Sequence, residues 1–315
     1  MIFEPSRSMS LKFPVSTPAS PAAPRPLALR IGFDMEFELS TQLPTAMVLM
    51  LDVHPDVAHQ LERPERLTVD PCDLRVEPFF DGFGNRCSRL VAAPGTLKLS
   101  YDAVFNDVYA EEPQPAPETV QHHAGDLPTA VLPFLLGSRY CEVDRLSATA
   151  WDLFGKLPPG GARVLAINEW VFKNVTFGYK LTRPNKTALD TCVERTGVCR
   201  DMMHLAISFC RALNIPARYA TGYLGDIEAD PDPTPMDFSA FYEVYLGGKW
   251  WPMDARHGRA RIGRVLMARG RDAADVALVT SFGRHRLTKF HVVTEEVESL
   301  PRLTTTPDVP YALSA

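Results

Sequence analysis

The sequence predicts an α+β protein in which an all-β sandwich comes before a domain of helices and antiparallel strands. Residues 29–39 alternate apolar and polar side chains strictly, which is the pattern of a half-buried strand. Beyond about residue 130 the apolar period lengthens to that of helices, and strand-like runs return after residue 217. Helices followed by an antiparallel sheet are typical of the α+β class.

The sandwich is predicted over residues 28–110. Four further apolar runs follow the first strand, at residues 46–53, 67–80, 87–91 and 96–105. The segment from Asp81 to Asn85 has the composition of a turn between two of them. Such regular spacing favours short paired strands rather than helices.

Composition sets the remaining boundaries. Residues 1–27 are rich in Pro, Ser and Ala, which predicts a disordered leader, and Met9 is an alternative start to Met1. Prolines among polar residues predict a linker over residues 111–129. The second domain is then expected over residues 130–300, with a tail at 301–315.

The second domain is predicted to contain helices at residues 132–136, 143–154, 164–175 and 198–213. Strands are expected at residues 217–224, 238–246 and 249–254. Between the last two, Gly247 and Gly248 form the signature of a two-residue hairpin turn.

Composition also excludes several classes of function. A net charge of -5 provides no basic field for a nucleic acid, and no apolar run approaches the ~20 residues of a membrane span. The six cysteines are scattered without paired spacing, which favours reduced thiols, no metal and a cytoplasmic location. We expect no cofactor. The acidic, proline-containing loop at residues 226–237 is interpreted as solvated, with calcium binding as the alternative.

Cys199 is the candidate nucleophile. It follows a glycine at the predicted first turn of the helix at 198–213, where unpaired N–H groups and the helix dipole favour a thiolate. The alternative is a small core residue without chemistry.

Three blocks around this cysteine resemble the core of bacterial transglutaminase-like proteins. They run from Gly197 to Leu205, from Cys210 to Tyr219 and from Thr221 to Asp226. The resemblance implies a papain-like core with a Cys–His–Asp triad and an N-terminal β domain. It therefore covers nearly all of the chain after the leader.

A fourth block departs from the family pattern at two positions. The family has histidine and tryptophan where this chain has Ser239 and Phe241, and Asp254 matches the aspartate of the triad. Independently of the family, the hairpin register places Asp254 opposite Phe241 and diagonal to Ser239, on one face of the sheet. The predicted catalytic positions are thus Cys199, Ser239 and Asp254.

Serine cannot replace the imidazole as a base, because its hydroxyl stays neutral at working pH. If the hairpin register continues, His257 points to the opposite face. His204 lies ~140° around the helix from Cys199, and we interpret it as a hydrogen-bonded structural residue. Neither histidine is predicted to take over the role.

Other conspicuous side chains have structural interpretations. Trp250 and Trp251 are expected to pack, and Arg200 and Arg218 to bind local carboxylates or carbonyls.

The resemblance implies acyl transfer or amide hydrolysis through a thioester on Cys199, acting on a protein or peptide. Ser239 predicts that this activity is impaired or absent. The alternative is a pseudoenzyme that binds a protein or peptide partner in the groove without turnover. A serine introduced into an active enzyme is a third possibility.

Overall fold

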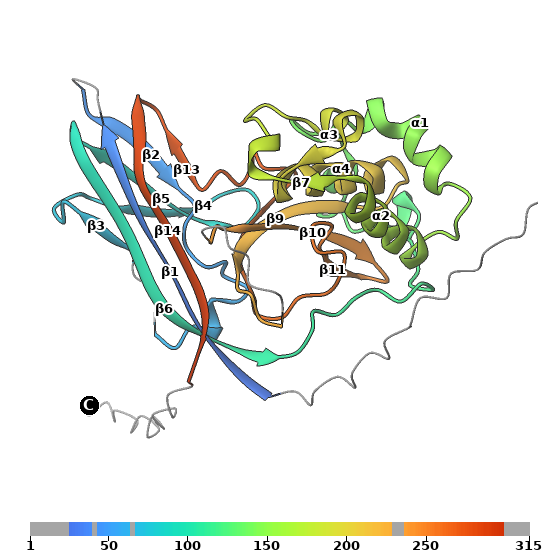
Figure 1. Cartoon of the computed structure of the whole chain (residues 1–315), viewed down its shortest axis with the longest axis horizontal. Coiled ribbons are helices and arrows are strands. Elements are labelled where there is room, and N and C mark those ends of the chain that lie inside the picture. Colours follow the sequence, from blue (N-terminus) through green and yellow to red (C-terminus); the bar gives the residue numbers. More distant parts are fainter. Residues whose placement is uncertain (1–24, 40–42, 64–66, 229–235, 299–315) are drawn as a thin grey trace, which may run out of the picture.

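The α+β architecture is confirmed by a computed structural model, which describes residues 25–39, 43–63, 67–228 and 236–298 (Figure 1). A sandwich of two sheets, one of them with long strands, forms one side of the molecule, and a third four-stranded sheet with the helices forms the other. The predicted leader and the tail at 301–315 fall outside the described residues, except that residues 25–27 already belong to the first strand.

In the described chain, one layer is a four-stranded antiparallel sheet in the order β14-β1-β6-β3. Its strands are β1 (Arg25–Leu39), β3 (Thr68–Asp70), β6 (Gly95–Tyr109) and β14 (His285–Val297). Every second residue of β1 from Leu27 to Leu39 is buried, as the strict alternation predicted.

The facing layer has the order β13-β2-β5-β4 within the described residues. It contains β2 (Thr45–Leu49), β4 (Glu77–Phe80), β5 (Arg86–Ala92) and β13 (Val279–Ser281). Met47, Leu49 and Leu90 pack with the buried side of β1, so the two layers share a core. The single run predicted at residues 67–80 is in fact divided between the two sheets, as β3 and β4.

The C-terminal strands correct the predicted domain division. The second domain was expected to continue to residue 300, yet β14 pairs with β1 along most of its length and β13 pairs with β2. The sandwich is therefore completed by a segment far away in the sequence. Residues 111–129, predicted to be a linker, contain no α-helix or strand.

The helices surround α4 (Cys199–Ala212), which lies at the centre of the second domain. Around it lie α1 (Val143–Phe154), α2 (Gly161–Asn174) and α3 (Ala188–Glu194), and a short parallel pair, β7 (Thr176–Phe177) and β8 (Thr196–Gly197), precedes it. The region predicted to be helical at 132–136 is a 3-10 turn, Leu132–Leu135.

The sheet beside the helices has the order β11-β10-β9-β12 in the described chain. Its strands are β9 (Ala217–Leu224), β10 (Ser239–Leu246), β11 (Lys249–Met253) and β12 (Arg264–Gly270). Tyr242 pairs with Met253, which confirms the register predicted from the Gly247-Gly248 turn. Both glycines have positive φ, as such a turn requires.

The two faces of β10 have different neighbours. Ala240 and Tyr242 pack into the core around α4, whereas Phe241 packs with Ala220 and Leu266 on the side of the sandwich. Because side chains alternate along a strand, Ser239 shares the face of Phe241. The sheet therefore separates the helical core from the sandwich.

Removal of β14 should destabilise the whole chain. A protein ending at Arg284 would expose the second edge of β1 and lose buried Val292, whose burial alone contributes about 1.5–3 kcal/mol. We expect the free energy of unfolding in urea to fall by more than about 3 kcal/mol, relative to a chain ending at Glu298. Equal midpoints for the two chains would contradict this.

Candidate active site

The start of α4 is fixed by a buried carboxylate. Asp201 is fully buried, and its Oδ2 accepts hydrogen bonds from the Val198 N–H at 3.1 Å and the Thr182 hydroxyl at 2.5 Å. Its Oδ1 accepts from the Arg200 guanidinium at 2.8 Å. A side chain at Gly197 would come within 2.8 Å of Asp201, so glycine is required before the helix. Cys199 is thereby held at the first position of α4.

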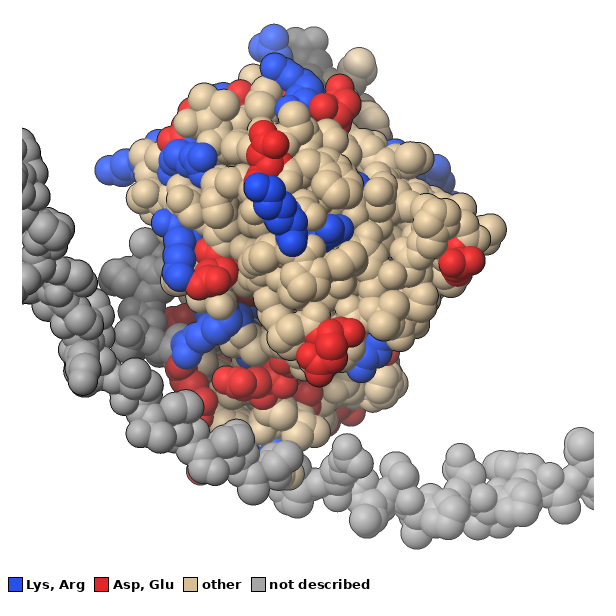
Figure 2. Space-filling model, turned by 90° about the vertical axis from the view of Figure 1, so that its right-hand side faces the viewer, with Lys and Arg blue, Asp and Glu red and all other residues tan. Residues whose placement is uncertain are grey.

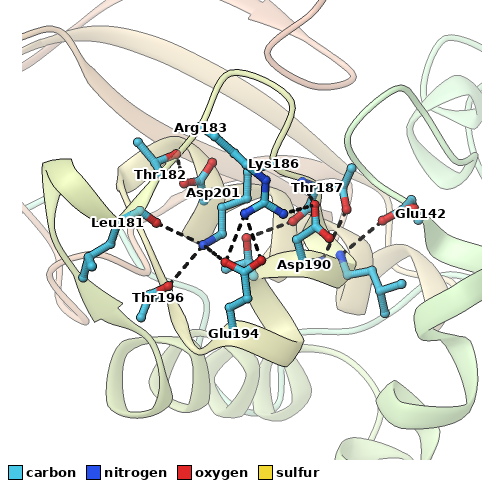
Figure 3. Close-up of polar contacts among 12 residues, drawn as sticks. Glu142, Leu181, Thr182, Arg183, Lys186, Thr187, Asp190, Glu194, Thr196 and Asp201 are labelled. Atoms are coloured by element: carbon cyan, nitrogen blue, oxygen red, sulfur yellow. Dashed lines mark hydrogen bonds and ion pairs between the residues drawn. The ribbon is translucent and has the colours of Figure 1, made fainter.

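A second polar network holds the loop in front of this helix (Figure 3). Fully buried Lys186 donates to the Leu181 carbonyl at 3.1 Å, the Glu194 carboxylate at 2.8 Å and the Thr196 hydroxyl at 3.2 Å. Arg183 also pairs with Glu194. The segment from residue 181 to 196 is therefore tied together immediately before Cys199.

The Cys199 side chain lies against the beginning of β10. The residue is half-buried, and the backbone N–H groups of Ala240 and Arg200 act on its sulfur together with the charge of Arg256. Burial raises the pKa of the Cys199 thiol, and these three groups offset only part of that rise. The start of the helix alone therefore does not keep the Cys199 thiol ionised, contrary to the expectation from the sequence.

Ser239 precedes Ala240 at the start of β10, and its carbonyl accepts a hydrogen bond from the Thr221 hydroxyl at 3.3 Å. Its residue is buried, and its hydroxyl has no hydrogen-bond partner among the described residues. Burying an unpaired hydroxyl costs free energy, so this position is not optimised for serine. The structure places Ser239 on the face of β10 that carries Phe241.

Asp254 follows the end of β11 and is almost completely buried. Its Oδ2 lies 2.7 Å from Nη2 of Arg264 and 2.8 Å from Nδ1 of His257. Burial by itself raises the pKa of the Asp254 carboxyl, but His257 and Arg264 outweigh it and hold that pKa well below its usual range. Asp254 is therefore ionised at neutral pH.

Arg264 links this carboxylate to the linker and to β10. Its Nε donates to Glu112 at 2.8 Å, and its guanidinium lies 4.4 Å from the centre of the Phe241 ring. The contact with Phe241 agrees with the register, which sets Asp254 opposite that residue. The contact of Arg264 with both Asp254 and Phe241 fits the predicted placement of Asp254 on the face of Phe241.

The predicted orientation of His257 is wrong. The hairpin register cannot be extended to residue 257, because β11 ends at Met253 and a turn begins. Oδ1 of Asp254 accepts the N–H groups of Arg256 and His257 at 2.9 and 3.0 Å, which bends the chain back. The imidazole of His257 thereby reaches the carboxylate of Asp254, the first residue of the same turn.

The remaining predictions concern side chains with structural roles. His204 accepts the Ala273 N–H at 3.1 Å and stacks on Tyr140 with ring centres 5.1 Å apart. Burial lowers the pKa of His204 to about 3, so it is a neutral structural histidine, as expected. Arg218 binds the Glu243 carboxylate at 2.6 Å, which also confirms its predicted role.

Basic and acidic side chains are interspersed on the face shown in Figure 2, which lies at the helical end of the molecule. No helix in the described residues is long and apolar enough to cross a membrane.

The comparisons with known proteins agree with the fold and with the cysteine motif. A family model described as the transglutaminase-like superfamily matches residues 148–255. A crystal structure from Cytophaga hutchinsonii, described as "a Putative Cysteine Protease", aligns with a TM-score of 0.76 and 34% identity over 87% of this chain and 92% of that one. The chain belongs to the transglutaminase-like superfamily.

Its curated relatives include mycobacterial proteins. An uncharacterised Mycobacterium leprae protein is 30% identical over 117 residues, which are 36% of this chain and 42% of that protein. An uncharacterised Mycobacterium tuberculosis protein is 25% identical over 232 residues, which are 67% of this chain and 73% of that protein. The chain thus spans less than half of the first relative and most of the second.

The network of Figure 3 predicts that replacing Lys186 destabilises the protein more than replacing Lys180. Lys186→Met would leave the Leu181 carbonyl and the Thr196 hydroxyl without their donor, so the free energy of unfolding should fall by roughly 1–3 kcal/mol. Lys180→Met, at an exposed position of the same loop, should change it by less than about 0.5 kcal/mol. Chemical denaturation of both variants checks this, and equal losses would mean that the buried network adds no stability.

Proposed function

We propose that this chain is a cysteine acyltransferase or amide hydrolase that forms a thioester on Cys199. The observation that carries the proposal is the position of this thiol. It stands half-buried at the first residue of α4, with the N–H groups of Ala240 and Arg200 at its sulfur. Family membership supports the same chemistry, since the motif around Cys199 is the family's nucleophile motif.

The reaction has two steps. The Cys199 thiolate attacks an amide carbonyl carbon, the C–N bond breaks, and the nitrogen leaves as ammonia or an amine after taking up a proton. Water or an amine then attacks the thioester, and sulfur leaves. Unpaired N–H groups at the start of α4 can stabilise the negative oxygen in both steps. Neither step requires a cofactor. The proposed substrate is a protein or peptide amide.

Ser239 lowers the rate of this chemistry. Its hydroxyl has no basic lone pair comparable to that of imidazole, and a positioned acid–base group contributes about 10²- to 10⁴-fold. Turnover should therefore be weak compared with that of a family member with histidine at this position.

The second candidate function is binding without turnover. It is favoured by one observation, namely that burial raises the pKa of the Cys199 thiol while the Ser239 hydroxyl makes no hydrogen bond within the described residues. A chain of this kind would hold a protein or peptide partner beside Cys199. For both candidates, the cytoplasmic location stays a prediction.

Two cysteine variants test the proposal. Cys72 is exposed and Cys199 half-buried, whereas the remaining cysteines are buried. Glutamine-containing peptides are incubated with hydroxylamine, and ammonia release and hydroxamate formation are measured. Cys199→Ala should abolish both, and Cys72→Ala, the matched control, should retain them.

Other outcomes separate the two functions. Turnover that survives Cys199→Ala would contradict the thioester. Peptide binding that is equal in the wild type and in Cys199→Ala, without turnover in either, would establish the binding protein instead.

A further inference from the structure

We infer that His257 is the catalytic acid–base residue that serves Cys199, in the role that Ser239 cannot fill. This inference rests on the proposed function and names the group that moves the proton. It comes from the turn after β11, which brings an imidazole onto the buried carboxylate of Asp254.

The hydrogen bond between these two residues fixes the state of the imidazole. An ionised carboxylate only accepts hydrogen bonds, so Nδ1 of His257 carries the proton that is donated to Oδ2 of Asp254 at 2.8 Å. Nε2 is then the basic nitrogen of the neutral ring. The His257 side chain is 23% exposed, so the ring is not fully enclosed by the protein.

The turn is built in a way that holds the ring in place. Besides the two N–H groups bound to Oδ1 of Asp254, the Gly258 N–H donates to the Asp254 carbonyl at 3.0 Å. Gly258 has a φ of +66°, and a side chain there would meet the ring of Phe172 at 2.7 Å. The turn therefore packs against the end of α2, and His257 is positioned by the backbone on both sides.

Two observations on Arg256, the residue before His257, link this turn to the region of Cys199. The charge of Arg256 acts on the sulfur of Cys199. The Arg256 guanidinium also lies 4.0 Å from the centre of the Phe177 ring, and Phe177 pairs with Gly197, two residues before the cysteine.

The same carboxylate would hold an imidazole at position 239. The observed register ends with Tyr242 opposite Met253, and one further step would set Asp254 diagonal to Ser239, the position that matches the family's histidine. In this chain, His257 occupies Oδ2 of Asp254, while the hydroxyl of Ser239 is unpaired. The orienting aspartate is thus retained with a different imidazole.

The proton balance follows from this arrangement. Nε2 of His257 takes the proton of the Cys199 thiol, and the imidazolium returns it to the nitrogen that leaves when the C–N bond breaks. In the second step Nε2 takes a proton from water or the acceptor amine. It then passes this proton to the sulfur as the thioester opens.

Several charged groups surround the pair and belong to its pH dependence. They lie on β12 and the segment before it, on the linker, on the turn itself and at the entry to β10: Arg264, Arg261, Glu112, Arg256 and Asp237. The arginines among them stay charged across the neutral range, whereas burial raises the pKa of the Asp237 carboxyl, which also acts on the Cys199 thiol.

The first test needs no substrate. The rate of Cys199 alkylation by iodoacetamide is measured from pH 5 to 10 in a Cys72→Ala background. With His257 present, a thiolate–imidazolium pair should give reaction at pH 6.5, and His257→Gln should lower that rate about 10- to 100-fold. The remaining profile should follow a single titration of a thiol with a raised pKa. His285→Gln, at an exposed position at the start of β14, is the matched control and should leave the profile unchanged.

The second test adds turnover and rescue. His257→Gln should lower turnover of the glutamine peptide by about 10²-fold or more. Ser239→His combined with His257→Gln should recover most of the alkylation at pH 6.5, because the new ring can bind the same Asp254 carboxylate. Circular dichroism and thermal unfolding establish that each variant is folded, and the rescue in the double variant excludes a purely structural loss.

The outcomes distinguish the inference from the proposed function. Turnover that requires Cys199 but is unchanged in His257→Gln, with an unchanged alkylation profile, would overturn the role of His257 and leave the thioester chemistry standing. A profile that depends on His257, without turnover of any peptide, would retain the imidazole–thiol pair and refute the proposed function.

Discussion

The buried carboxylate of Asp254 is the constraint on which the candidate site depends. A buried charge must be paired, and here Arg264 and His257 bind the same oxygen while two backbone N–H groups bind the other. Arg264 also reaches Glu112, so the carboxylate connects the hairpin, β12 and the linker. Removing one of these groups would leave the buried carboxylate less well compensated, at a cost in free energy.

The pKa of the Cys199 thiol is subject to two opposing influences. The start of α4 supplies N–H groups that favour a thiolate, and Asp201 holds that start in place. Burial of Cys199 nevertheless raises the pKa of its thiol, so a thiolate requires an additional positive partner. A site with a well-positioned cysteine and no imidazole would be inert, and this is the physical difference between the two functions considered for the chain.

Local patterns predicted much of this structure. Helix 143–154 and strand 217–224 are found with the predicted bounds, and the two glycines at 247–248 set the register of the hairpin. The return of β14 to the sandwich was missed, because alternation within a strand does not reveal its partner. His257 was misplaced since the register was extended beyond the strand. The tendency of aspartate to bind backbone N–H groups two or three residues ahead was the signal that could have indicated the turn at Asp254.

The tautomer of the His257 imidazole is the most direct test of the claim that this ring lies between Asp254 and Cys199. Nitrogen NMR of the labelled imidazole at neutral pH should show a protonated Nδ1 and a bare Nε2, because Asp254 accepts from Nδ1. The Nε2 resonance should also shift when Cys199 is replaced by alanine. A proton on Nε2, or a resonance that does not respond to Cys199→Ala, would contradict an imidazole that is shared between the buried carboxylate and the thiol.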